Sequence, residues 1–537
     1  MNKKITIFIF AALLQVILAG CTNQSSEIGQ KQDDSMNNEK REEIVLAFDS
    51  EPETGFDPVV GWGRYGSPLF QSTLFKRNDE LEIVNDLAEK YEVNNHIWTV
   101  YLRDDVQFSD GEKLTANDVV FTFNKILESG SVVDLNLISE VKALDETTVQ
   151  FELKEAQSTF INALVGTGIV PEHAYSDDYA ENPIGSGPFK LVEWRKGEQL
   201  IIEANEYYYD ERPHFKKITF LFLAEAASLA AAKTGQVDFA YIPASFSNQQ
   251  VEGMRLESIE TVDNRGIAFP MVEAGEVTKE GIVIGNDVTA DVAIRQAVNI
   301  AIDRQVLVEG VLEGHGTPAH TSVDKLPWWN PETVIDDGDR LAAEKILTDA
   351  GWEKNKEAIF EKQGLKAEFT LYYPANDTIR QSLAISVADM LKPLGISVQV
   401  EGASWEIIGE KMHSNPILMG WGSHDPYEMF NIYGSENAGI EYYNTGYYKN
   451  EVVDHYFEQA IAATSEDEAI EYWKKAQWDG KTGFSAKGDA AWAWLVNINH
   501  LYLVNDKLDI GKQRIHVHGH GWPVTDNIVD WKWKDES

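Results

Sequence analysis

Three histidines near the C-terminus, His516, His518 and His520, stand at alternate positions of the chain. On an extended strand such residues share one face at a spacing of about 6.6 to 7 Å, and imidazole is a suitable ligand for nickel, copper or zinc. However, alternate side chains on a strand point in parallel directions instead of converging on one ion, and Gly519 indicates a bend. Two interpretations stand, a metal site and a packing cluster, and we favour the packing cluster.

Two loops rich in glycine and aromatic residues carry the other candidates for chemistry. Residues 61–66 read Gly-Trp-Gly-Arg-Tyr-Gly, and their glycines permit close backbone approach. Arg64 can hold a carboxylate through two parallel hydrogen bonds, while Trp62 or Tyr65 can stack on a ligand. The alternative is a glycine-rich surface turn with an arginine at its rim. Residues 421–427, Trp-Gly-Ser-His-Asp-Pro-Tyr, supply a second set of candidates, Trp421, His424 and Asp425.

Common catalytic signatures are missing from the sequence. It contains no G-x-S-x-G, H-E-x-x-H or C-x-x-C motif. Residues 480–482, Gly-Lys-Thr, are similar to the end of a phosphate-binding loop, but Lys475 stands where the first glycine of that motif belongs. We therefore predict a binding protein that needs no cofactor, and not an enzyme.

The only cysteine of the chain, Cys21, follows an N-terminal segment of distinct composition. Two lysines form a positive region, residues 5–18 are apolar apart from two polar positions, and Ala19 and Gly20 precede the cysteine. The apolar run suits a signal peptide and is too short for a comfortable bilayer span. This motif resembles the lipobox of bacterial lipoproteins, which implies a signal peptide over residues 1–20 and lipidation of Cys21. An ordinary secretory signal with a chance cysteine is the alternative.

Composition and charge limit the class of protein. The 537 residues include 46 Lys and Arg against 87 Asp and Glu, a net charge of −41. Such a surface repels nucleic acid, which argues against a nucleic-acid partner. Hydrophobic residues at 43% are ample for a packed core, and a single cysteine allows no internal disulfide. Residues 21–43 are polar and contain no aromatic side chain, so we expect a disordered tether there.

Strand-like and helix-like segments alternate irregularly after the tether. Short apolar or alternating runs predict strands at residues 44–48, 97–102, 149–153, 189–194 and 396–400. Thr115 is a suitable N-cap for a helix that follows it. Apolar periodicity and terminal residues predict helices at 119–127, 224–233, 291–303, 341–350 and 378–391. This pattern indicates a mixed α/β protein with several sheets.

Motifs that cover nearly the whole mature chain resemble a known family. Residues 86–91, 98–112 and 114–123 are similar to the signature of the peptide/nickel family of ABC-importer substrate-binding proteins, solute-binding protein family 5. Locally this signature is a strand, a Ser-Asp-Gly turn and a capped helix. Further family-like segments follow in the expected order, at residues 185–189, 205–208, 234–238, 294–304, 350–352 and 391–396.

The resemblance implies an α/β fold of the two-lobed periplasmic-binding-protein kind, type II, in the large cluster with an extra inserted subdomain. The first lobe is expected to combine residues 44–66, 184–288 and 495–537. The inserted subdomain is expected at residues 67–183 and the second lobe at residues 289–494. A hinge between the lobes would let them close over a ligand.

The resemblance also places the two candidate loops at the ligand. Residues 61–66 match the position where the first lobe of the family meets its ligand, and residues 421–427 match a facing loop of the second lobe. Peptide-binding members carry an aspartate two or three residues after the tryptophan, which pairs with the α-amino group of the peptide. Here Asp425 stands one position later, which is a departure from that pattern. His424 is equally suited to a structural hydrogen bond and to ligand contact.

Nickel-chelate members of the family offer the first alternative. They use arginines of the inserted subdomain to hold carboxylates of a metal complex, and this chain has no arginine between Arg103 and Arg195. His315, His320 and His424 remain available as metal-binding imidazoles.

Together these features predict an extracytoplasmic lipoprotein, anchored to the cell membrane through Cys21. It is expected to capture a small peptide-like solute in a cleft between the lobes and deliver it to an ABC importer. The expected partners are the solute, the permease and ATPase subunits, and the membrane through the lipid anchor, with the protein itself a monomer. A signalling receptor or a chaperone-like lipoprotein is the alternative from another class.

Overall fold

The computed structural model of the protein describes residues 41–52, 54–129, 133, 135–279, 281–519 and 522–534. Cys21, the predicted signal peptide and His520 lie outside the described residues, as does the predicted tether up to residue 40. The chain from Arg41 onward forms one compact unit. In the described part of the chain, every helix is too short or too polar to cross a membrane.

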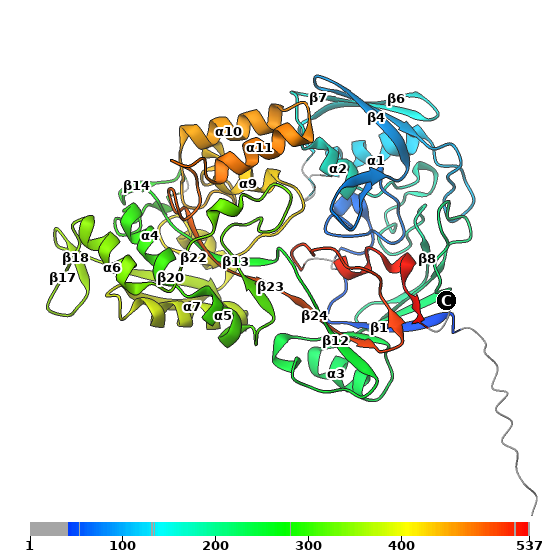
Figure 1. Cartoon of the computed structure of the whole chain (residues 1–537). Helices are drawn as coiled ribbons and strands as arrows, with labels where there is room; N and C mark the ends of the chain where they lie inside the picture. Colours follow the sequence, from blue (N-terminus) through cyan, green and yellow to red (C-terminus); the bar gives the residue numbers. More distant parts are fainter. Residues whose placement is uncertain are drawn as a thin grey trace, which may run out of the picture. The chain divides into compact units, whose positions relative to one another are not determined.

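A seven-stranded mixed sheet combines segments that are far apart in the sequence (Figure 1). Its strand β1 (Glu43–Phe48) runs parallel to both neighbours, β10 (Lys217–Phe222) and β11 (Phe239–Tyr241). The apolar run of β1 is explained by this central place, since Leu46 and Ala47 are fully buried. The strand order is β12-β24-β11-β1-β10-β9-β8, where the others are β12 (Met254–Ile259), β24 (His500–Asn505), β9 (Gln199–Ala204) and β8 (Phe189–Arg195). Helix α3 (Glu225–Lys233) packs beside β11.

A six-stranded sheet forms the second large sheet, with apolar layers on both faces. Neighbouring residues of one strand contribute to different layers, as Leu371 and Tyr372 do, because successive side chains of a strand point to opposite faces. The strand order is β16 (Gly316–Pro318), β23 (Trp492–Ile498), β13 (Asn264–Ala268), β22 (Ile417–Met419), β20 (Glu368–Pro374) and β21 (Ser397–Ala403).

Helices cover the two faces of the six-stranded sheet. The layer on one face includes residues of α4 (Val292–Ala301), α5 (Arg304–Val311), α6 (Arg340–Asp349) and α7 (Thr378–Leu391). The layer on the other face includes residues of α8 (Trp405–Lys411), α9 (Tyr427–Tyr433), α10 (Glu451–Ala462) and α11 (Glu466–Gln477).

A separate four-stranded antiparallel sheet carries its own core. Its order is β4 (Ala88–Asn94), β5 (Ile97–Leu102), β7 (Thr148–Leu153) and β6 (Ile138–Asp145). Trp98, Val100 and Leu102 of β5 alternate inward and pack in one cluster with residues of α1 (Ala116–Ser129) and α2 (Phe160–Gly166). Thr115 Oγ1 accepts a hydrogen bond from the Asn117 amide at 3.3 Å, which confirms the predicted cap of α1.

Small sheets complete the fold. They are β2 (Phe75–Arg77) with β3 (Ile83–Asn85), β14 (Glu276–Val277) with β15 (Val283–Ile284), β17 (Glu353–Lys354) with β18 (Phe360–Lys362) and β19 (Leu365–Lys366), and β25 (Leu508–Asp509) with β26 (Lys532–Trp533).

Two short connections join the seven-stranded sheet to the six-stranded sheet. Strand β12 leads into β13 through residues 260–263, and β23 leads into β24 through Asn499 alone (Figure 1). These connections are adjacent, because Thr261 Oγ1 donates to the carbonyl of Ile498 at 2.7 Å. A pair of adjacent crossings is a suitable place for a hinge.

Most predicted elements are confirmed within a few residues. The predicted single helix at 291–303 is wrong in one respect: α4 ends at Ala301, and Asp303 begins α5 by accepting a hydrogen bond from the Val306 amide. Strand β13 pairs with β22 and β23 in the six-stranded sheet. The local sequence of a strand does not reveal which sheet it joins. The predicted lobe boundaries stay predictions.

Candidate functional site

A cavity of about 190 Å³ brings charged side chains together from distant parts of the chain. We call it the charged cavity. Its cationic lining residues are Arg64, Lys76, Arg77 and Arg514, and its acidic ones are Asp86, Asp425 and Asp526. Acidic residues outnumber basic ones almost two to one in the whole chain. The cavity reverses this balance, so it favours a ligand with an anionic group.

The loop of residues 61–66 presents Arg64 and Tyr65 to the charged cavity. Gly63 has a positive φ of 84°, and a Cβ there would lie 2.7 Å from Pro68 Cβ, so the tight turn requires glycine. The Arg64 guanidinium lies 4.4 Å from the centre of the Tyr65 ring. Arg64 remains exposed. Both residues are placed where a ligand can reach them.

Trp62 of the same loop points into the core beside the seven-stranded sheet. It is 7% exposed, its indole N–H donates to the Pro68 carbonyl at 2.7 Å, and it meets Phe56 and Trp522 edge to face. The lining of the charged cavity does not include it. The geometry therefore favours a packing role for Trp62 over the predicted stacking on a ligand.

In the loop of residues 421–425, Trp421 packs against the core, whereas His424 and Asp425 line the charged cavity. Trp421 packs against Tyr443 at 5.9 Å, and its backbone amide donates to Asn264 Oδ1, so it does not line the charged cavity. Gly422 passes so close to the Val262 carbonyl that a Cβ would lie 2.2 Å from its oxygen. This contact turns His424 and Asp425 toward the charged cavity.

His424 is a neutral hydrogen-bond donor in the cavity wall. Its Nε2 lies 2.9 Å from the Ile515 carbonyl, to which it can donate. Burial, with help from Arg514 and Arg77, holds the pKa of His424 well below its usual range. The sequence left two roles open for His424, a structural hydrogen bond and ligand contact. The structure shows the structural hydrogen bond.

Asp425 connects the loop of residues 421–425 to helix α2, which carries Asn162. Its Oδ1 accepts hydrogen bonds from Asn162 Nδ2 and from the Tyr427 amide, both at 3.0 Å. Burial raises the pKa of Asp425 to about 6, although its hydrogen bonds and Arg77 act in the opposite direction. The carboxylate is therefore largely charged at neutral pH and is held by groups of the protein.

Arg77 of β2 lies beside Asp425 and also links α2 to the loop of residues 421–425. Its Nη1 donates to the Leu81 carbonyl at 2.7 Å, and its Nη2 donates to the His424 carbonyl at 2.8 Å and to Asn162. Burial lowers the pKa of Arg77 to about 10, so it stays charged at neutral pH. A further hydrogen bond links the segment before α2 to helix α10, where Ser158 Oγ donates to the Ala460 carbonyl at 2.8 Å.

The C-terminal segment closes the cavity from a third direction. Arg514 Nη1 donates to the carbonyl of Arg77 at 2.8 Å, and Arg514 pairs with Asp526. Asp526 in turn accepts from the Ser67 amide, next to the glycine-rich loop. These contacts tie residues separated by several hundred positions into one wall.

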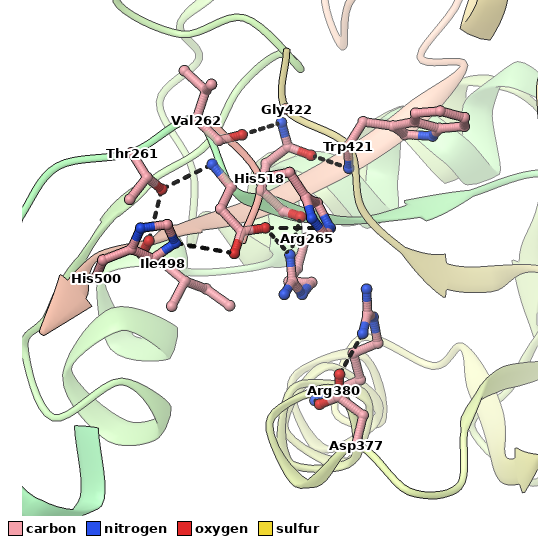
Figure 2. A network of polar contacts seen from close by, with 12 residues as sticks. Thr261, Val262, Arg265, Asp377, Arg380, Trp421, Gly422, Ile498, His500 and His518 are labelled. Carbon is pink, nitrogen blue, oxygen red and sulfur yellow. Dashed lines mark hydrogen bonds and ion pairs between the residues drawn. The ribbon is translucent and has the colours of Figure 1, made fainter. Parts of the chain in front are cut away.

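The described C-terminal histidines, His516 and His518, contact different partners, and Figure 2 shows His518 with His500 beside the two crossings between sheets. His518 Nε2 lies 3.5 Å from Asp263 Oδ1, and His500 Nε2 lies 3.7 Å from Asp263 Oδ2. His516 Nδ1 lies 3.1 Å from His500 Nδ1, and burial holds the pKa of His516 well below its usual range. Among the described residues, there is no group of three or more His, Cys, Asp or Glu side chains arranged for a metal ion. This arrangement supports the packing interpretation of His516 and His518, while His520 lies outside the described residues.

The two other histidines considered for metal binding, His315 and His320, lie outside the charged cavity. His315 Nδ1 lies 3.1 Å from Ser258 Oγ. Burial lowers the pKa of His320 to about 3, so its ring is neutral. Neither residue lines the charged cavity.

Sequence reasoning missed Arg77, Asn162 and Arg514 as members of the site. None of them belongs to a motif, and only the fold brings them together.

Comparisons with known proteins agree with this architecture. The family described as bacterial extracellular solute-binding proteins, family 5 Middle, matches residues 82–441. Protein XP55 of Streptomyces lividans is 32% identical over 525 residues, which cover 93% of this chain and 91% of that protein. The oligopeptide-binding protein AppA of Bacillus subtilis (strain 168) is 27% identical over 491 residues, or 84% of this chain and 87% of that protein.

A solved structure gives the same result in three dimensions. NikZ from Campylobacter jejuni in complex with Ni(L-His) has a TM-score of 0.73 and 25% identity, and the match covers 92% of this chain and 99% of that one. These findings confirm the predicted resemblance and the two-lobed α/β fold.

Proposed function

Since this chain belongs to the bacterial extracellular solute-binding proteins of family 5, we propose that it captures a small peptide-like solute in the charged cavity. It then delivers the solute to the permease of an ABC importer. The observation that carries this proposal is that Arg64, Arg77 and Asp425, from three separate segments, line one cavity in which cations outnumber acids. A carboxylate and an amide backbone are the ligand groups that such a lining binds well.

Direct binding measurements test this proposal. We expect the tripeptide Ala-Ala-Ala to bind in isothermal titration calorimetry and Arg64→Ala to weaken it by about tenfold, because a charge-assisted hydrogen bond is lost. Arg195→Ala is the matched control, since Arg195 is exposed and pairs only with neighbouring glutamates in the described residues, Glu193 and Glu198. Unchanged affinity in Arg64→Ala would contradict the placement of the ligand.

A nickel chelate is the second candidate, because the cations of the cavity also suit the carboxylates of a metal complex. The same calorimetric cell can receive Ni(II)-histidine in place of the tripeptide. Binding of this complex with no binding of Ala-Ala-Ala would favour the chelate over the peptide.

We further propose that Cys21 carries a lipid that keeps the receptor at the cell membrane. The supporting feature is the apolar segment before Cys21, which resembles a lipoprotein signal. Cys21→Ser should release the protein from the membrane fraction into the soluble extracytoplasmic fraction. If the variant remains in the membrane fraction, the anchor lies elsewhere.

A further inference from the structure

A second cavity, of about 310 Å³, adjoins the charged cavity and differs from it in chemistry. We call it the tryptophan cavity, because Trp98 of β5, Trp328 and Trp473 of α11 line it, together with Tyr91 and Ile470. Only Arg77 and Glu466 among its lining residues carry charge. A cavity of this size and lining is typical of a site for an apolar group of a small molecule.

The three tryptophans are buried with their hydrogen-bonding capacity unused. Their exposed fractions are 4% for Trp98, 2% for Trp328 and 1% for Trp473. Within the described residues, four buried indole N–H groups have no hydrogen-bond partner, and three of these four belong to this cavity. Burying an unpaired donor is unfavourable, so each unpaired donor calls for an explanation.

Tryptophans elsewhere in the described part of the chain show that the fold can satisfy buried indoles. Trp352 donates to Asp291 at 3.0 Å, Trp494 donates to the Tyr433 hydroxyl at 2.9 Å, and Trp531 donates to Asn527 at 3.0 Å. Among the indoles of the described residues, three of the four unpaired donors belong to residues that line this one cavity.

The two cavities share a wall. Arg77 and Asn162 line both of them. The Arg77 guanidinium also lies 5.9 Å from the centre of the Trp328 ring, so one side chain faces charged groups on one side and an aromatic ring on the other. Because they share these two lining residues, the two cavities are adjacent.

From this geometry we infer that the tryptophan cavity is the apolar subsite of the same ligand, whose anionic group lies in the charged cavity. The ligand class is a short peptide with a bulky apolar side chain. A small, fully polar metal chelate would leave the tryptophan cavity empty. The inference rests on the proposed function, since it assumes that the charged cavity binds the solute.

The test compares two tripeptides that differ in one side chain. Ala-Phe-Ala should bind the wild-type protein at least about tenfold more tightly than Ala-Ala-Ala in isothermal titration calorimetry, because a phenyl ring leaves water. Ala463→Phe fills the tryptophan cavity from the end of α10 and should abolish this preference while changing the affinity for Ala-Ala-Ala by less than about twofold. Arg64→Ala is the control, because it should weaken both tripeptides equally and keep the preference.

A second filling variant and a second probe keep the outcomes separate. If Ala463→Phe does not fold, Ile161→Phe fills the cavity from the opposite wall, on α2. Indole, followed by saturation-transfer NMR, should bind the wild-type protein and not the filled variant. This probe does not depend on the charged cavity.

Each result has a distinct meaning. Equal affinities of the wild-type protein for the two tripeptides, or a preference that survives filling, would overturn the inference and leave the proposed function standing. If neither tripeptide binds, the peptide function fails, and indole alone decides whether the apolar subsite exists. Dimers in sedimentation velocity that dissociate on filling would assign the cavity to a second copy of the chain and overturn the inference.

Discussion

In the charged cavity the acidic groups already have partners within the protein, whereas in the tryptophan cavity three donors have none among the described residues. Asp526 pairs with Arg514, and Asp425 accepts hydrogen bonds from Asn162 and Tyr427. Charges in a partly dry cavity are costly unless they are held in place, so the polar half is organised before a ligand arrives. The apolar half depends on the shape that its buried tryptophans give it. One residue, Arg77, lines both the charged cavity and the tryptophan cavity.

The largest expected effect tests whether packing holds the tryptophan cavity. Trp328→Ala should lower the free energy of unfolding by about 3–5 kcal/mol, because a large side chain leaves a buried layer. Trp405→Ala is the control and should cost less than about 1 kcal/mol, since Trp405 is 40% exposed. Urea unfolding measures both. A similar small cost for the two variants would show that the cavity is not built by packing.

The next prediction concerns the effect of the buried Asp425 carboxyl on the pH dependence of stability. The pKa of Asp425 is about 6 in the folded protein against 3.8 as its ordinary value. The folded state therefore binds more protons than the unfolded state between these values, so stability falls as pH rises from about 4 to 6. The contribution approaches about 3 kcal/mol, at about 1.4 kcal/mol for each pKa unit. Asp425→Asn should remove it.

The measurement is urea unfolding of the wild-type protein and Asp425→Asn at pH 4 and at pH 7. Other buried acids titrate in both proteins, so the difference between the two isolates Asp425. The variant should gain stability relative to the wild type as pH rises. An unchanged difference would mean that Asp425 is not held in a buried site.

The smallest effect sharpens the contrast between used and unused donors. Trp494→Phe removes an indole that donates to the Tyr433 hydroxyl, whereas Trp328→Phe removes one without a partner in the described residues. Both changes lose similar volume from buried positions. Trp494→Phe should therefore cost about 1 kcal/mol more than Trp328→Phe in thermal or urea unfolding. Equal costs would indicate that Trp328 has a hydrogen bond after all.

Much of the fold could be predicted because its signals are local. The strand at 97–102 and the helix at 378–391 match β5 and α7 residue for residue, since period and capping are properties of neighbouring residues. Sheet membership is different. Strand β13 joins the six-stranded sheet through long-range pairing that no local pattern records.

The candidate site could be predicted only in part for the same reason. Arg64 and Asp425 stand in recognisable loops and do line the charged cavity. Trp62 and Trp421 stand in the same loops but turn into the core, because an aromatic ring in a glycine-rich turn can face either way. The tryptophan cavity has no sequence signature, because its three indoles come from segments far apart in the chain.

The most direct test of the central claim is native mass spectrometry of the protein purified from its source, beside Arg64→Ala and Ala463→Phe purified in the same way. The wild-type protein should carry short peptides that contain a bulky apolar residue. Arg64→Ala should lose most of this bound material, and Ala463→Phe should retain only peptides with small side chains. Bound material of the same mass and amount in all three proteins would contradict the account.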